Sequence, residues 1–247
     1  MRGTGPIPYR PYAVRFMDPE HLPYVVREHL RLFPDGFFAR LGPRFLSAYT
    51  GTYMTSPHAL AFIAVAKERP VGFLVGVTDP ALHRRHMLRR HGGALLIRAL
   101  GGLAVRPALL GHFLRTRAPR YLSKLTRRQQ PDQPQWPTTA GPQTSRGPGA
   151  VLAHIAVDES ARSLGIGADL VERFVAACAI AGCARVSLVT VEGPGGAGPY
   201  YERRGWRREG ESRTPEGRGL LTYERVLETP SWPPGWTREE TGEPHRG

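Results

Sequence analysis

The fold is decided by residues 155–170, which read IAVDESARSLGIGADL. The stretch begins with apolar residues typical of a buried strand, passes through a polar turn, and continues with the apolar periodicity of a helix. Glycines at 165 and 167 let the backbone turn tightly and leave its N–H groups uncovered. The helix N-terminus adds a partial positive charge and Arg162 adds a full one, so this turn is suited to hold a pyrophosphate.

The glycine turn differs from two other phosphate-binding loops. It lacks the third glycine and the later ribose-binding acid of a dinucleotide fingerprint, and it lacks the Gly-Lys-Ser/Thr ending of a Walker loop. A Gly-x-Gly turn by itself also occurs where a strand merely meets a helix. The residues on either side therefore decide its meaning.

The flanking sequence predicts a mixed sheet of the α+β class. Apolar and β-branched runs predict strands at residues 12–16, 60–66, 71–77, 151–157, 185–191, 206–208 and 220–227. Helical spacing predicts helices at residues 19–32, 36–54, 166–181 and 199–204. An early antiparallel hairpin followed by a strand–helix–strand crossover gives a mixed, mostly antiparallel sheet flanked by helices.

Three further segments set the domain organisation. Residues 80–128 predict a helical insertion between the early hairpin and the strand before the glycine turn. Residues 129–149, rich in Pro, Gln, Thr and Gly, predict a flexible loop. Residues 228–247 are rich in Pro and charge and predict a disordered tail. We therefore expect a single domain over residues 1–227.

Two stretches resemble motifs of the GNAT acetyltransferase superfamily. Residues 155–170 are similar to its motif A, a strand ending in Val, a short loop, Arg/Gln-x-x-Gly-x-Gly/Ala and a helix. Residues 197–206, AGPYYERRGW, are similar to its motif B, whose usual form is Ala-x-x-x-Tyr-Glu-x-x-Gly-Phe. The two stretches occur in the family's order and at its separation. The resemblance covers about residues 150–227 and implies the GNAT fold.

The resemblance implies roles for individual positions. Backbone groups of Ile155 and Val157 would pair with the pantetheine arm of an acyl-CoA, and the amides of the glycine turn would bind its pyrophosphate. Tyr201 matches the motif B tyrosine, which often protonates the leaving thiolate, and a phenol carries the necessary proton at pH 7. A packing aromatic under the sheet is the other interpretation of Tyr201. The expected cofactor-binding residues are Ile155, Ala156, Val157, Arg162, Ser163, Leu164, Gly165, Ile166, Gly167, Ala168 and Tyr201.

One departure from the family pattern concerns position 194. Many members carry an Asn three residues before the motif B alanine, but this position is Pro194 and the chain contains no Asn. The segment 193–198 would therefore contact the cofactor arm through its backbone alone.

Acyl transfer to an amine needs the amine in its neutral form, so we look for a general base. The candidates are His154 on the motif A strand, Asp35 in the turn 33–36, and Glu192 at the end of the next strand. His154 could instead be a satisfied core histidine, and Asp35 could cap a turn or helix. The predicted catalytic residues are Tyr201, His154, Asp35 and Glu192.

The chain is strongly basic, with 34 Lys and Arg against 21 Asp and Glu. Residues 80–128 carry twelve basic side chains and no acidic one, interleaved with Leu, Ile and Phe. Such a region could line a tunnel for a long acyl chain, lie on an anionic membrane, dock an acyl carrier protein or bind a phosphorylated acceptor. It could also pack on the core or form a homodimer contact. Nucleic acid is the rival partner, but no nucleic-acid-binding motif accompanies the charge.

The sequence thus predicts an acyl-CoA-dependent N-acyltransferase. The donor would be acetyl-CoA, a longer acyl-CoA or an acyl-carrier protein, and the acceptor an amine of a small molecule, amino sugar, nucleoside or peptide, attacking directly in a ternary complex. Neither Cys178 nor Cys183 occupies a motif position, so neither a cysteine intermediate nor a metal is expected. We expect a cytoplasmic protein, or one peripheral at the membrane. The alternative is a non-catalytic or nucleic-acid-associated GNAT-fold protein that binds through the basic helices.

Overall fold

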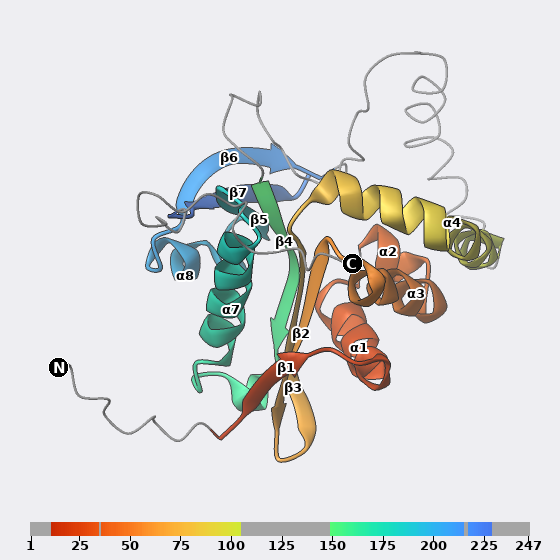
Figure 1. Ribbon diagram of the computed structural model, residues 1–247, viewed down its shortest axis with the longest axis horizontal. Coiled ribbons are helices and arrows are strands. Elements are labelled where there is room, and N and C mark those ends of the chain that lie inside the picture. Colours follow the sequence, from red (N-terminus) through yellow and green to blue (C-terminus); the bar gives the residue numbers. More distant parts are fainter. Residues whose placement is uncertain (1–10, 35, 105–148, 215–216, 229–247) are drawn as a thin grey trace, which may run out of the picture.

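A seven-stranded sheet forms the centre of the computed structural model, which describes residues 11–34, 36–104, 149–214 and 217–228 (Figure 1). Its order is β1-β2-β3-β4-β5-β7-β6, and neighbouring strands are antiparallel except for the parallel pair β4 and β5. The predicted mixed, mostly antiparallel sheet is confirmed. The strands are β1 Ala13–Phe16, β2 Ala59–Ala66, β3 Arg69–Val77, β4 Gly149–Val157, β5 Arg185–Val191, β6 Arg207–Arg213 and β7 Gly219–Val226.

The hairpin between β2 and β3 turns over two residues. Lys67 and Glu68 have φ values of 46° and 61°, the left-handed backbone that a tight hairpin turn requires at both central positions. The four-residue connection predicted from sequence was therefore too long, because Arg69 and Pro70 already pair with β2.

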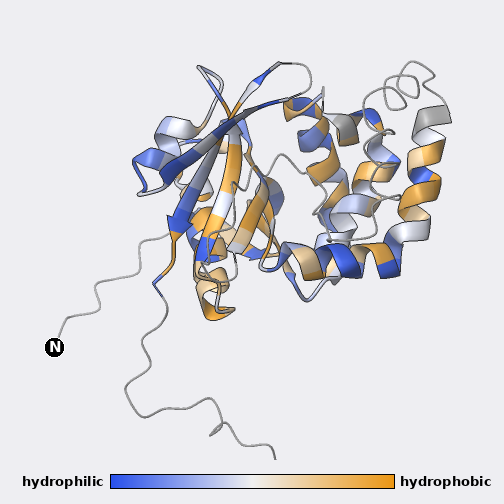
Figure 2. Ribbon diagram, turned by 90° about the horizontal axis from the view of Figure 1, so that it is seen from above, coloured by the Kyte–Doolittle hydropathy of each residue, from blue (hydrophilic) through white to orange (hydrophobic). Residues whose placement is uncertain are grey.

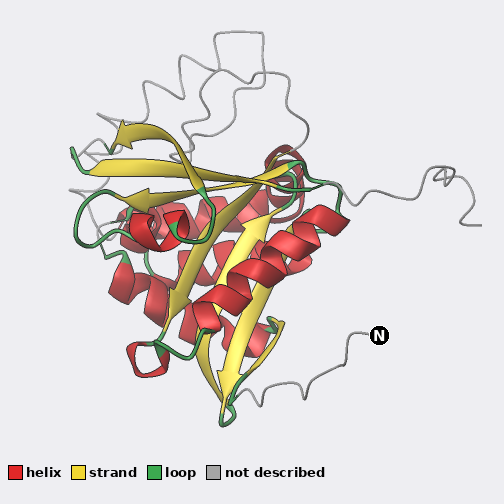
Figure 3. Cartoon of the chain, turned by 90° about the vertical axis from the view of Figure 1, so that its left-hand side faces the viewer, coloured by secondary structure: helices red, strands yellow, loops and turns green. Residues whose placement is uncertain are grey.

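Helices cover both faces of the sheet, as Figures 1 and 3 show. One face carries the 3-10 helix η1 and helices α1 to α4, and the other carries α7 and α8. The bounds are η1 Pro19–His21, α1 Leu22–Leu32, α2 Phe37–Arg40, α3 Pro43–Thr55, α4 Pro80–Ala104, η2 Glu159–Ala161, α7 Ile166–Ile180 and α8 Gly198–Glu202.

The helix predicted over residues 36–54 is two helices, so that prediction was wrong in its continuity. Gly42 has a φ of 94°, which an α-helix does not contain, and Pro43 then opens α3 at a position where a missing N–H is tolerated. The chain changes direction between α2 and α3 as a result.

Each face of the sheet has its own hydrophobic core. Leu170 and Phe174 of α7 pack on Leu74 and Leu188 on one face, and this cluster extends to Tyr201, Trp206 and Tyr223. On the other face, Phe45, Tyr49 and Tyr53 of α3 pack on Ile63 and Phe73. The Phe174 ring occupies the place where a side chain on Gly76 would begin, so β3 and α7 approach closely at that glycine.

Helix α7 ends as the sequence predicted. Gly182 has a φ of 78°, its N–H donates to Ala179 O, and the N–H of Cys183 donates to Cys178 O. This pair of bonds is a Schellman cap, which satisfies carbonyls at the helix end and turns the chain toward β5.

Helix α4 is the described part of the predicted insertion. It runs from Pro80 to Ala104 and bends within its length (Figures 1 and 2). The pair Gly92 and Gly93 lies at its midpoint, and glycine pairs are a usual cause of helix kinks. The rest of the predicted insertion and loop, residues 105–148, and the tail from residue 229 lie outside the described residues. Gly149, predicted as the end of the loop, already belongs to β4.

Candidate functional site

The sheet opens between its two parallel strands. β4 pairs with β5 only from Gly149 to Val151, which lie opposite Arg185 to Ser187. β5 continues along β7 as far as Val191, and β4 continues along β3 as far as Val157. Beyond Val151 the two strands therefore follow different neighbours, and a gap widens between them toward their C-terminal ends.

The gap exposes backbone polar groups of β4. In an antiparallel pair, successive residues direct their N–H and C=O alternately toward and away from the partner strand. The N–H of Asp158 donates to Val71 O at 2.8 Å, so this residue faces β3. By alternation the backbone of Val157 and that of Ile155 face away from β3, into the gap. These are the residues expected to meet a pantetheine arm.

A β-bulge sets the directions of the β4 side chains. The pairing with β3 shifts by one residue between His154 and Leu152, so Ala153 is the extra residue. Leu152, Ile155 and Val157 pack in the core under α7, whereas Ala153 and Ala156 pack in the core under α1 and α3. The bulge thus brings His154 to the α1 face.

The glycine turn at the end of β4 is a loop of uncovered amides. Ser163 and Gly165 have φ values of 70° and 78°, and α7 begins at Ile166 with no side-chain cap. Among the described residues, no backbone carbonyl accepts from the N–H groups of residues 163–168. Consecutive N–H groups in such a left-handed turn at a helix N-terminus form an anion-binding nest.

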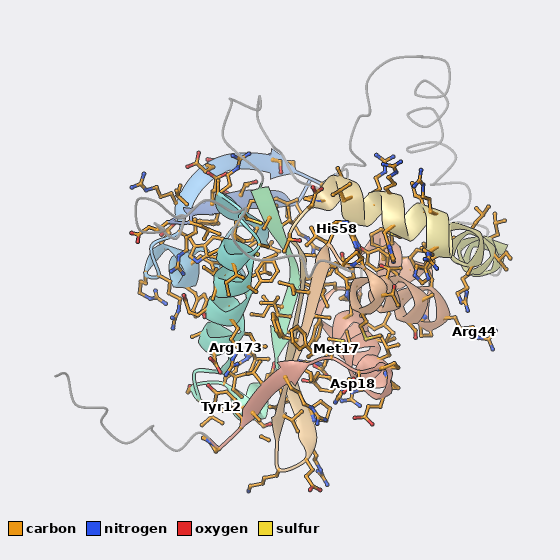
Figure 4. All side chains as sticks on the ribbon, in the orientation of Figure 1. Tyr12, Met17, Asp18, Arg44, His58 and Arg173 are labelled. Atoms are coloured by element: carbon orange, nitrogen blue, oxygen red, sulfur yellow. The ribbon has the colours of Figure 1, made fainter. Side chains whose placement is uncertain are left out.

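Charged side chains surround this loop. Arg162 lies 3.4 Å from Glu159, and Glu159 also lies 3.4 Å from Arg31 of α1. Asp158 accepts from the N–H and hydroxyl of Ser160 at 2.9 and 2.8 Å, and these bonds lower the pKa of its carboxyl. Tyr12 lies near the start of α7 (Figure 4), with its hydroxyl 4.0 Å from where a Cβ on Gly165 would be.

Two adjacent tyrosines of α8 have different surroundings. Tyr201 is buried, with ring centroids 5.5 Å from Trp206 and 6.2 Å from Tyr223. Tyr200 is half-buried under the guanidinium of Arg204, and its hydroxyl lies 3.7 Å from where a Cβ on Gly167 would be. Burial raises the pKa of both phenols, so both keep their proton at neutral pH.

The Tyr200 hydroxyl is buried and has no hydrogen-bond partner among the described residues. Buried hydroxyls are normally paired, so this one, beside the first turn of α7, is available to donate to a ligand bound there. Sequence reasoning passed over Tyr200 because the motif alignment selects the next residue.

His154 lies among aromatic rings on the α1 face. Its ring centroid is 4.7 Å from that of His29 and 6.0 Å from that of Phe33, both contributed by the end of α1. Burial lowers the pKa of His154 to about 3 and that of His29 to about 4. Both imidazoles are therefore neutral at physiological pH. His29 was not predicted from sequence, since a histidine within an amphipathic helix carries no local signal.

The other predicted catalytic residues lie apart from His154. Glu192 follows β5 directly, donates its N–H to Gly219 O at 3.0 Å, and places its carboxylate against Gly219 of β7. Asp35 lies outside the described residues. The structure thus brings His154 together with His29, and Glu192 with β7.

A further unpaired hydroxyl lies on α1. Tyr24 is buried against Phe73 of β3, with its ring edge-on at 6.4 Å between centroids, and its hydroxyl has no partner among the described residues. Burial raises the pKa of this phenol, and the nearby carboxylates of Glu28 and Asp158 raise it further.

Comparison with known families identifies part of the chain. Residues 131–206 match the model of the Acetyltransferase (GNAT) family, a span that contains β4, the glycine turn, α7, β5 and α8. No curated protein sequence matches the chain.

Solved structures show the same fold at low sequence identity. Ard1 from Thermoplasma volcanium aligns with a TM-score of 0.51 and 13% identity, covering 88% of this chain and 98% of its own. An aminoglycoside 6'-N-acetyltransferase complexed with coenzyme A aligns with a TM-score of 0.51 and 13% identity, covering 87% and 96%. The aminoglycoside 6'-N-acetyltransferase from Enterococcus faecium aligns with a TM-score of 0.50 and 13% identity, again covering 87% and 96%.

Proposed function

The chain belongs to the GNAT superfamily of acetyltransferases, and we propose that it transfers an acetyl or longer acyl group from an acyl-CoA to an amine. One observation carries the proposal. The gap between β4 and β5 ends at a turn whose amides from residue 163 to residue 168 have no backbone acceptor among the described residues. A long thioester with a diphosphate partway along it matches a groove of backbone groups that leads to an anion-binding nest.

The proposed donor site uses mostly backbone. The pantetheine amides would pair with Ile155 and Val157, as one strand pairs with another, and the pyrophosphate would accept from the loop amides. Arg162 would add charge at the same corner. Tyr200 would donate its unpaired hydroxyl to the same ligand, because that hydroxyl lies beside Gly167.

The reaction we propose is direct attack in a ternary complex. The amine nitrogen forms a bond to the thioester carbon, the carbon–sulfur bond breaks, and the amine gives up a proton as the thiolate gains one. A phenol that stays protonated can supply the thiolate proton, and we propose Tyr201 for this role from its motif position. Tyr200 is the alternative donor, since it lies next in the chain with an unpaired hydroxyl.

The proposed amine site is the α1 face of the gap, where His154 and His29 meet. A base with a pKa of about 3 is a poor proton acceptor near pH 7, because catalytic bases work best near the ambient pH. We therefore propose that His154 orients the amine with its neutral imidazole. Glu192 lies apart from His154, exposed at the end of β5, so we propose that it takes the departing proton through water.

Donor binding is tested by thermal unfolding with coenzyme A, acetyl-CoA and longer acyl-CoAs. A ligand at 100 times its dissociation constant should stabilise the folded state by about 2.7 kcal/mol. An acyl-carrier protein carrying the same acyl group tests the alternative donor. If neither donor shifts the unfolding temperature, the proposed function is wrong.

Turnover then separates the two tyrosines. Tyr201→Phe should lower kcat with little change in coenzyme A affinity, whereas Tyr200→Phe should weaken affinity with a smaller change in kcat. The acceptor is sought with panels of amino sugars, nucleosides, peptides and other small amines. The reverse pattern would exchange the roles of Tyr200 and Tyr201.

A further inference from the structure

Helix α4 presents most of its surface to solvent. It packs on α3, with His83 and Leu95 buried at the contact and Gly102 against the carbonyl of Leu41. The His83 ring lies 4.7 Å from the ring of Tyr53. The opposite side of the helix lies at the edge of the molecule (Figures 1 and 2).

The exposed side of α4 is basic, most strongly in its first half. Residues 80–104 contain five arginines, Arg84, Arg85, Arg89, Arg90 and Arg98, and no Asp or Glu. Arg44, labelled in Figure 4, adds an exposed positive charge from the start of α3, close in sequence to the Leu41 that α4 contacts. This surface therefore attracts anions.

The same helix is also the most apolar exposed element that the structure describes. Ten large hydrophobic side chains are exposed among the described residues, and five of them belong to α4. Their exposed fractions are 40% for Leu82, 54% for Leu88, 60% for Leu96, 72% for Ile97 and 55% for Leu100. Figure 2 shows hydrophobic and hydrophilic residues alternating along the helix.

We propose that α4 lies on an anionic lipid surface. Arginine side chains can reach the headgroups while their stems and neighbouring leucines enter the boundary of the acyl chains. The 25 residues of α4 give a helical path of about 38 Å at about 1.5 Å per residue, which the bend divides into two segments, so each segment would make a shallow contact. Among the helices that the structure describes, none is long and apolar enough to cross a membrane.

Other partners fit this surface less well. Nucleic acid would use the arginines, but α4 has no Phe, Tyr or Trp on which bases could stack, and it would leave the exposed leucines in water. An acidic protein would have to bury those leucines beside its own carboxylates, which costs free energy. A lipid surface accepts both kinds of side chain at once.

The test is flotation of the full chain with vesicles of phosphatidylcholine alone and of phosphatidylcholine mixed with phosphatidylglycerol. We expect binding to the mixed vesicles that weakens as salt is raised. The triple change Arg85→Glu, Arg89→Glu and Arg90→Glu should lower the partition coefficient on the order of 100-fold, since each arginine contributes about fivefold. The matched control is Arg203→Glu, Arg207→Glu and Arg213→Glu, which changes the net charge equally and should lower binding by about threefold or less.

A second pair of variants tests the apolar part. Leu96→Ser with Ile97→Ser should weaken vesicle binding at least tenfold. Each methylene group that no longer enters the acyl boundary costs about 0.8 kcal/mol of binding free energy. Ile180→Ser with Val226→Ser, at exposed positions outside α4, should leave binding unchanged. Unfolding temperatures equal to that of the parent chain show that each variant is folded.

Four results would overturn the proposal. They are equal binding to neutral and anionic vesicles, equal loss in the α4 and control variants, binding to duplex DNA without binding to vesicles, and a dimer that dissociates in the α4 variants. The readout is binding alone, so it is independent of whether acyl transfer is found.

Discussion

A carboxylate at position 164 tests the glycine turn sharply, because its effects on folding and on donor binding have opposite signs. Leu164 lies between Ser163 and Gly165, the two residues with left-handed backbone, and its side chain is 47% exposed. Leu164→Glu therefore needs no repacking of the core. A negative charge beside the N-terminus of α7 should raise the free energy of unfolding by about 0.3 to 1 kcal/mol.

The same charge should weaken coenzyme A binding. At a separation of about 8 Å and an effective dielectric constant of about 40, two unit charges interact by about 1 kcal/mol. A pyrophosphate in the nest carries two such charges, so the repulsion amounts to about 2 kcal/mol, or about 30-fold in Kd.

Isothermal titration calorimetry with coenzyme A measures the affinity, and urea denaturation measures the stability. Leu164→Gln is the matched control, since it has nearly the same shape as the glutamate variant without its charge. The difference in Kd between the two variants should shrink as salt is raised. If both variants bind coenzyme A equally at low salt, the phosphate does not lie at this turn.

Three other predictions address the loop, the core and the buried histidines. Glu159→Gln releases Arg162 from an ion pair of 3.4 Å and removes a negative charge, so the Kd for coenzyme A should fall by about threefold. An unchanged Kd in calorimetry would place the pyrophosphate away from Arg162. Gly76→Ala should lower the free energy of unfolding by about 3 kcal/mol, because the Phe174 ring occupies the space of the new methyl group. Gly51→Ala in α3, where nothing lies within 4 Å of the new atom, should raise it by about 0.5 to 1 kcal/mol in the same urea titration. Burial lowers the folded-state pKa of three histidines from the ordinary 6.5, to about 4 for His29, about 4 for His83 and about 3 for His154. As the pH falls, these imidazoles are therefore protonated in the unfolded chain before they are protonated in the folded one. The free energy of unfolding should therefore decrease below pH 6.5 by about 1.4 kcal/mol per pH unit for each imidazole, down to its folded pKa. His154→Gln should reduce that slope. An unfolding temperature that is constant between pH 6.5 and 4.5 would contradict the burial of these rings.

The part of the fold that depends on local rules was predictable from the sequence. β5 was predicted with its observed bounds, and α7 begins at Ile166 as the glycine turn indicated. Gly182 ends α7 in a left-handed cap, which follows from the absence of a Cβ. These features need only neighbouring residues to determine them.

The arrangement of the site was less predictable because it depends on pairing between distant residues. The gap beside β4 exists because β5 pairs with β7, whose residues lie 29 to 41 positions further along the chain, and no periodicity within β4 signals it. The bulge at Ala153 changes the face of the next residue, so alternation alone misassigns His154. The surroundings of Tyr200 and Tyr201 likewise follow from packing on α7 and β7.

The bulge gives one strand access to both proposed substrates. If β4 alternated strictly from Leu152 onward, with Ala153 paired in the ladder and not bulged, His154 would face α7 and Ile155 would face α1. With it, Ile155 and Val157 pack under α7, where the donor loop lies, and His154 meets His29 on the opposite face. The pKa of both imidazoles is low because their surroundings are poorly solvated, and the same desolvation would lower the pKa of an ammonium group bound between them. We therefore infer that the α1 face makes an amine nucleophilic chiefly by withholding water from its charged form, so that a strong base beside it is not required.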